Sequence, residues 1–130
     1  MGQPQVGKTS IIRSYMESVS MEGRNVARTL TLEDFSKIEE IKLDDGSTHR
    51  VHLKIWDAAG DASVKNVAPL FLKNVSCCVF VYSINSSHSF KGLDEWHEAF
   101  TDYDDKNAMS VLVGNKSDLE DHRTVPVVNG

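Results

Sequence analysis

The pattern G-x-x-x-x-G-K-[ST], which residues Gly2 to Thr9 match, constrains this chain more than any other feature. In such a loop, successive backbone N–H groups form a concave nest for phosphate oxygens, and the lysine, here Lys8, reaches the β- and γ-phosphates of a nucleotide. Thr9 can offer its hydroxyl to Mg²⁺ at the start of a helix, whose dipole also favours negative charge. The pattern predicts a phosphate-binding loop if a strand precedes it and a helix follows it.

The following residues have the periodicity of a helix, because apolar side chains recur at three- and four-residue steps between Thr9 and Val19. These apolar positions are Ile11, Ile12, Tyr15, Met16 and Val19. The strand is not part of the sequence, since Met1 stands one residue before Gly2. Two explanations are therefore open: the start of the domain lies outside this chain, or the motif is accidental.

Composition limits the classes of protein to which the chain can belong. With 130 residues, 40% of them hydrophobic and 25% charged, the chain fits one soluble globular domain. A net charge of −5 with both signs interspersed excludes the basic surface of a nucleic-acid binder. The longest apolar run, Val75 to Ile84, is too short to cross a bilayer, and no signal segment opens the chain, so we expect a cytoplasmic location.

The middle of the chain has the alternation of a β-hairpin. Phe35 to Leu43 resembles a strand with Ile38 and Ile41 as its apolar positions, and Asp44 to Ser47 is a turn signal. A second strand follows, in which apolar residues alternate with His52, Lys54 and Trp56; they are Val51, Leu53 and Ile55. The two strands predict an antiparallel pair.

Two later apolar runs predict strands of a parallel sheet that is covered on both faces: Cys77 to Tyr82 and Met109 to Val113. We expect both Cys77 and Cys78 to be inert residues of the core. A short helix is predicted around Val67 to Lys73.

A longer helix, capped by Ser86 or Ser87, is predicted between these two strands. Its apolar face suggests core packing rather than a ligand site, and consists of Phe90, Leu93, Trp96, His97 and Phe100.

Strands that alternate with helices imply a doubly wound α/β fold, a mostly parallel sheet with one antiparallel hairpin. Such sheets bind ligands beyond the carboxyl ends of their strands. Three polar motifs stand at such positions, at Thr9, Asp57 and Asn115, and their agreement carries more weight than any one motif.

With these motifs in order, the chain resembles the Ras-like small GTPases, and most closely the Rab branch. After the phosphate loop come Trp56 to Gly60 (WDAAG) and Val113 to Leu119 (VGNKSDL), in the family's order and at its distances. The Rab pattern fits without a gap from Trp56 to Leu119. The resemblance implies a P-loop GTPase domain over residues 1–130 that binds GTP or GDP with Mg²⁺.

The resemblance assigns a guanine site to the last motif. Asp118 can accept hydrogen bonds from N1–H and N2–H₂ of guanine, whereas adenine would turn an acceptor toward it. Asn115 braces the site, and Lys116 lies along the base. The full set implied to bind nucleotide is Gln5, Val6, Gly7, Lys8, Thr9, Ser10, Gly60, Asn115, Lys116 and Asp118.

The resemblance also implies a magnesium site formed by Thr9, Asp57 and a switch threonine. Thr31 fits the Ras segment Thr-Ile-Glu-Asp, whereas the Rab segment Thr-Ile-Gly points to Thr29; we favour Thr31. The backbone N–H of Gly60 would sense the γ-phosphate, since glycine lets that segment approach and reorient.

The chain departs from the family at the residue that orients the attacking water, where Asp61 replaces glutamine. A carboxylate can only accept hydrogen bonds and repels phosphate, so we expect slow GTP hydrolysis. Lys8, Gly60 and Asp61 form the candidate catalytic set. Pro4, which has no N–H, and Gln5 replace the small residues usual in the phosphate loop, and both also favour slow hydrolysis. An alternative is a pseudo-GTPase scaffold; an ATPase or kinase disagrees with the guanine motif.

The family's central strand would precede Gly2 and its last strand and helix would follow Gly130, so both are lacking here. We expect the chain to be a piece of a longer GTPase, molten or aggregated alone, because the missing strand removes more than the ~5–15 kcal/mol of a domain. Implied partners are an exchange factor, a GTPase-activating protein, and effectors bound through Thr31–Phe35 and Gly60–Lys73. A membrane is expected only if a longer parent has a lipidated C-terminus.

Overall fold

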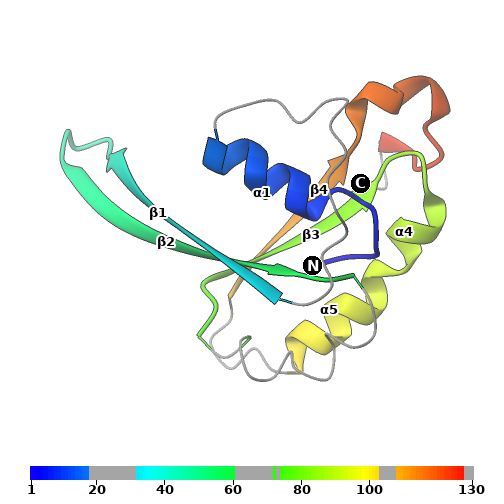
Figure 1. Ribbon diagram of the computed structural model, residues 1–130, viewed down its shortest axis with the longest axis horizontal. Helices are drawn as coiled ribbons and strands as arrows, with labels where there is room; N and C mark the ends of the chain where they lie inside the picture. The colour runs from blue at the N-terminus through cyan, green and yellow to red at the C-terminus, as the bar shows by residue number, and fades with distance from the viewer. Residues whose placement is uncertain (18–31, 61–71, 73, 103–107, 128–130) are drawn as a thin grey trace.

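The computed structural model describes residues 1–17, 32–60, 72, 74–102 and 108–127, and Figure 1 draws the remainder as a thin grey trace. The described elements are, in chain order, α1 (Lys8–Glu17), β1 (Leu32–Lys42), β2 (Thr48–Ala58), β3 (Cys77–Ser83), α4 (Ser87–Lys91), α5 (Leu93–Thr101), β4 (Met109–Asn115) and the 3₁₀ helix η1 (Ser117–His122). The predicted short helix at residues 67–73 lies almost wholly outside the described residues. None of the described helices is long and apolar enough to cross a membrane.

The predicted hairpin is confirmed. Strands β1 and β2 pair antiparallel along their whole length, from Leu32 opposite Ala58 to Lys42 opposite Thr48. The turn between them is closed by backbone hydrogen bonds, and the Asp45 carboxylate accepts from the Ser47 N–H at 2.8 Å. The turn end of this hairpin projects away from the other elements, and α1 lies beside the hairpin and contacts β2 (Figure 1).

The two apolar positions of the predicted first strand are not buried in β1, since Ile38 and Ile41 are 56% and 44% exposed. Residues three apart in a strand point to opposite faces, so the two isoleucines cannot share one buried face. Ile38 lies opposite His52, whereas Ile41 lies opposite His49 beside the turn. The neighbouring Glu39 is half-buried and accepts a hydrogen bond from the Tyr15 hydroxyl of α1 at 2.9 Å.

The predicted parallel pair is also confirmed, since β3 and β4 run side by side from Cys77 opposite Met109 to Ser83 opposite Asn115. The expectation that both faces are covered is wrong for the described residues. Met109 is 67% exposed, and Cys77 is exposed whereas Cys78 is buried. Side chains alternate along a strand, and in the described part of the chain α4 and α5 contact β3 on the face of its buried side chains.

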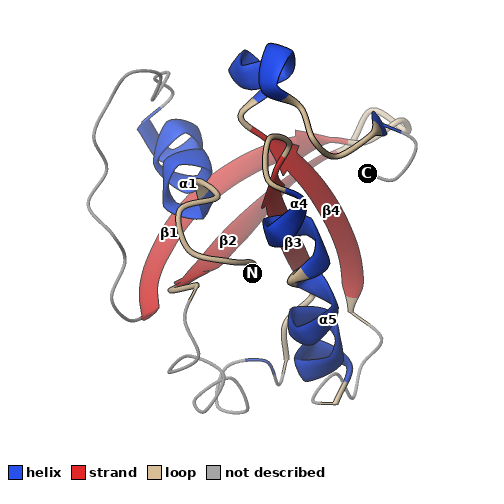
Figure 2. Ribbon diagram, turned by 90° about the vertical axis from the view of Figure 1, so that its right-hand side faces the viewer, coloured by secondary structure: helices blue, strands red, loops and turns tan. Residues whose placement is uncertain are grey.

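The aromatic stripe forms the core, as predicted. Trp96 and Phe100 of α5 are almost fully buried, and Phe100 meets Phe80 of β3 edge-on at 5.8 Å. His97 is exposed, although its ring stays 5.7 Å from that of Phe80. Figure 2 shows α4 and α5 in front of β3.

The predicted N-cap of the helix that carries the stripe is Ser86, whose hydroxyl accepts from the Ser89 N–H at 3.2 Å. The helix is divided at Gly92 into α4 and α5.

Candidate functional site

The loop from Gly2 to Thr9 begins alongside β3, where the Val81 N–H donates to the Met1 carbonyl at 2.8 Å. It turns sharply through positive φ angles at Gly2 (138°), Gln5 (62°) and Gly7 (96°). The helix α1 starts directly after it at Lys8, as the phosphate-loop pattern requires. Its first amides therefore adjoin the loop, an arrangement that suits an anion.

The Lys8 side chain folds back over its own loop. Its ammonium donates to the Gly2 carbonyl at 2.8 Å and to the Gln3 carbonyl at 3.0 Å. The two carbonyl oxygens hold the charged ammonium beside the loop. A bound phosphate could replace these carbonyl oxygens as the acceptor of its hydrogen bonds. Two carbonyl oxygens of its own loop thus hold the lysine in this position.

Asp57 joins the end of β2 to the start of α1. Its carboxylate is 1% exposed, and Oδ2 accepts a hydrogen bond from the Thr9 hydroxyl at 2.5 Å. A carboxylate and a hydroxyl are the hard oxygen ligands that Mg²⁺ prefers, usually with water and phosphate oxygens completing the octahedron. The described residues contain no cluster of three or more His, Cys, Asp or Glu side chains suited to a metal. The Thr9 and Asp57 pair is chemically suited to a phosphate-linked Mg²⁺.

Gly60 lies against the backbone of the phosphate loop. A Cβ atom at this position would lie 2.4 Å from the Pro4 nitrogen and 2.5 Å from the Gln3 carbonyl carbon. Backbone atoms cannot yield as a flexible side chain does, so only glycine fits here. The second motif therefore contacts the first directly.

Asn115 connects the third motif to the same loop from the end of β4. Its side-chain amide donates to the Val6 carbonyl at 2.8 Å, and a Cβ on Gly7 would lie 2.2 Å from that amide nitrogen. Lys116 follows in a left-handed conformation (φ 64°), which turns the chain into η1 with exposed Asp118 in its first turn.

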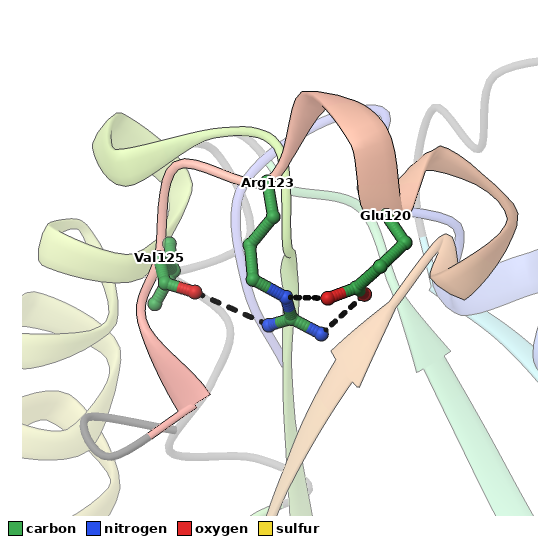
Figure 3. Close-up of polar contacts among 3 residues, drawn as sticks. All are labelled: Glu120, Arg123 and Val125. Carbon is green, nitrogen blue, oxygen red and sulfur yellow. Dashed lines mark hydrogen bonds and ion pairs between the residues drawn. The ribbon is translucent and has the colours of Figure 1, made fainter.

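Sequence reasoning missed the contacts that hold η1 in place, drawn in Figure 3. The Arg123 guanidinium donates to both Glu120 carboxylate oxygens, at 2.7 and 2.8 Å, and to the Val125 carbonyl at 3.1 Å. This pairing lowers the pKa of Glu120 and raises the pKa of Arg123. The buried Val125 is tied to Ile84 beyond β3 by a backbone hydrogen bond of 3.1 Å. The only signal in the sequence was the Glu-x-x-Arg spacing.

The structure brings together most of the candidate residues: the phosphate loop, Asp57, Gly60 and Asn115. A cavity of about 220 Å³ lies between loop residues 3–6, Lys116 and the segment that joins β3 to α4. Asp118 follows on η1 and does not line this cavity. Ser10 is half-buried in the first turn of α1. Three candidates, Thr29, Thr31 and Asp61, lie outside the described residues.

The phosphate loop, the buried aspartate and the asparagine brace define a P-loop nucleotide-binding fold, and comparison with protein families matches the Ras family over residues 1–130. The chain belongs to this family.

Rab-type relatives agree with this assignment. The chain is 33% identical to a Ypt/Rab-type GTPase Rab7 of Neurospora crassa and 33% identical to the Ras-related protein Rab-7a of Dictyostelium discoideum; each match covers 96% of the chain and 60% of the relative. It is 34% identical to the Ras-related protein RABG3f of Arabidopsis thaliana over 93% of the chain and 57% of the relative. The chain thus spans about three fifths of the length of these curated relatives.

Proposed function

We propose that this chain forms the nucleotide-binding part of a molecular switch that binds GTP or GDP together with Mg²⁺. The observation that carries the proposal is the contact of all three motifs at one loop. Thr9 donates to Asp57, Gly60 abuts the Gln3 and Pro4 backbone, and Asn115 holds the Val6 carbonyl. Independent motifs that meet in space support one shared ligand.

Each proposed role follows from the chemistry of the residue. Amides of residues 5–10 and the Lys8 ammonium bind the phosphates, while Thr9, Asp57 and the switch threonine, preferably Thr31 rather than Thr29, hold Mg²⁺. Asp118 selects guanine by accepting from N1–H and N2–H₂, and Lys116 lies along the base.

The test of this proposal is a competition assay on the purified full-length protein. Guanosine phosphates should displace a fluorescent N-methylanthraniloyl (mant)-GDP probe, whereas adenosine phosphates should not. Asp118→Ala should abolish this preference, while Asp121→Ala, an exposed carboxylate on the same short helix, serves as the matched control. Equal displacement by both nucleotides would contradict the proposal.

We further propose that GTP hydrolysis by this switch is slow, with Lys8, Gly60 and Asp61 as the catalytic set. Asp61→Gln supplies a carboxamide that can accept from water and donate toward the γ-phosphate, so it should accelerate hydrolysis. The measurement is single-turnover cleavage of bound GTP. A wild-type rate equal to or above that of the variant would refute this part of the proposal.

A second candidate, a pseudo-GTPase scaffold, is favoured by one described feature, namely Pro4 in the phosphate loop, since proline gives no N–H to a phosphate. Nucleotide content separates the two candidates. Denaturing the purified protein should release GDP if it cycles, GTP if it binds without hydrolysis, and nothing if it is a scaffold.

The partners proposed here follow from membership of the Ras family and the Rab-type relatives. They are an exchange factor, a GTPase-activating protein, and effectors that bind residues 31–35 and 60–73 when GTP orders them. We propose a role in vesicle trafficking or signalling from the cytoplasm. Membrane attachment would require a lipidated C-terminus in the full-length protein.

A further inference from the structure

The junction between α4 and α5 is occupied by a side chain from the phosphate loop. Gly92 at this junction has helical angles (φ −69°, ψ −6°), so its backbone alone would accept any residue. A Cβ at Gly92, however, would lie 2.2 Å from Gln3 Nε2 and 2.9 Å from both Gln3 Cγ and Cδ. The glutamine side chain therefore occupies the space that a side chain at position 92 would need.

The backbone of Gln3 contacts two other parts of the candidate site. Its carbonyl oxygen accepts from the Lys8 ammonium at 3.0 Å. Its carbonyl carbon and oxygen would lie 2.5 and 2.7 Å from a Cβ on Gly60, so these two backbones are in close contact. One loop residue thus links the lysine, the second motif and the helix junction.

The helix junction at Gly92, which the Gln3 side chain contacts, is fixed by its packing in the core. Leu93 and Trp96, which directly follow the junction in α5, are buried in the core. On the other side, the Gly92 N–H donates to the His88 carbonyl at 2.9 Å. A side chain that rests on such a junction can fix the backbone to which it is attached.

We propose that Gln3 is a positioning residue of the nucleotide site: its side chain, seated on Gly92, holds the loop so that the Gln3 carbonyl faces Lys8 and its backbone meets Gly60. This inference rests on the nucleotide-binding function proposed above. It adds a specific dependence of phosphate binding on a glycine that lies outside all three motifs.

The geometry separates this role from a general role in folding. Alanine at helical angles is normally neutral or stabilising when space allows, and the atoms in its way belong to a flexible side chain. The displaced glutamine can move into the cavity of about 220 Å³ that Gln3 lines together with His88 and Ser89. Gly92→Ala should therefore disturb the loop more than the fold.

The experiment measures dissociation of mant-GDP from the full-length protein carrying Gly92→Ala, Gln3→Ala or both. Each single variant should accelerate dissociation by about tenfold, the scale on which losing an outer-shell partner weakens a site. The double variant should match the single variants, because they remove the same contact. Thermal midpoints should change little.

Two control variants sharpen this test. Gln3→Met keeps the length of the side chain without its amide and should remain near the wild-type rate. Gly46→Ala, in the hairpin turn where a Cβ meets nothing within 4 Å, should leave dissociation unchanged.

The outcomes separate this inference from the proposed function. Multiplicative effects in the double variant, or wild-type dissociation in Gln3→Ala, would overturn the positioning role while nucleotide binding stands. A wild-type protein that binds no mant-GDP would overturn both. If Gly92→Ala did not fold, the contrast between Gln3→Ala and Gln3→Met would decide.

Discussion

Gly7 and Gly46 have similar backbone angles, with φ of 96° and 83°, but they lie in opposite surroundings. A Cβ on Gly7 would collide with the Asn115 amide at 2.2 Å, whereas a Cβ on Gly46 would meet nothing within 4 Å. Both positions need a residue that tolerates the left-handed region, and only one also needs the absence of a side chain. The same residue type therefore serves local chain reversal in the hairpin and close packing between distant segments in the phosphate loop.

The wider surroundings differ in the same way. The turn is held by neighbours in sequence, such as Asp45 bonded to the Ser47 N–H, and Ile41 and Leu43 beside it are exposed. The phosphate loop is held by residues from two distant strands, the buried Asp57 of β2 and Asn115 of β4. Mutations in the phosphate loop, which is held by contacts with distant segments, should therefore change the affinity for a ligand. Mutations in the hairpin turn should change only the free energy of unfolding.

The largest expected effect is at these two glycines. Gly7→Ala combines a left-handed alanine, at ~1–2 kcal/mol, with overpacking against Asn115, at ~1–3 kcal/mol. GDP affinity should fall by about 30-fold or more, since ~1.4 kcal/mol corresponds to a factor of ten. Gly46→Ala should cost only ~1–2 kcal/mol of unfolding free energy and leave GDP affinity unchanged. Fluorescence titration and chemical denaturation of the full-length protein measure the two quantities, and equal losses of affinity would remove the distinction.

The next effect compares two carboxylates. Asp57→Asn should raise the Mg²⁺ concentration that slows mant-GDP release by about 10- to 100-fold, because a metal-site carboxylate is replaced by a neutral amide. Asp45→Asn is the matched control, since this carboxylate also accepts a hydrogen bond but lies in the exposed turn. Release rates are measured across a magnesium titration. An identical magnesium dependence in Asp57→Asn and wild type would argue against a metal at this position.

The smallest expected effect concerns Glu39, where hydrogen bonds from Lys37 and then Tyr15 lower the pKa below its usual value of 4.5. A lowered folded pKa stabilises the protein above the unfolded pKa, and this stabilisation is lost as the pH falls through the folded value. Glu39→Gln should therefore slightly lower the thermal midpoint at neutral pH, with the difference vanishing under acidic conditions.

Glu40→Gln is the control for this prediction, since Glu40 is exposed and lies on the opposite face of β1. A difference between Glu39→Gln and wild type that persists at low pH would show that the effect is not caused by ionisation.

Features with a local cause could be predicted from the sequence. The alternation around Val51 and the Asp-Gly turn signal predicted the hairpin, and apolar runs predicted β3 and β4. The helix after the phosphate loop and the aromatic core on Trp96 were correct for the same reason, because periodicity reports which face of an element is apolar.

The features that could not be predicted from the sequence depend on which elements pack against each other in the fold. Apolar runs do not reveal whether a partner covers each face, so the exposure of Cys77 and Met109 was missed. The contact between the Gln3 side chain and Gly92 joins two residues that belong to no common motif. No rule of sequence spacing relates these two positions. The magnesium and guanine roles remain predictions, since Thr31 lies outside the described residues and Asp118 does not line the cavity beside the phosphate loop.

The hydrogen bond from Asn115 to the Val6 carbonyl spans 109 positions of the chain. During translation, at ~5–20 residues per second, the phosphate loop would be synthesised roughly 5–20 s before Asn115. A nascent chain paused ahead of β4 would therefore hold the phosphate loop without the hydrogen bond from Asn115.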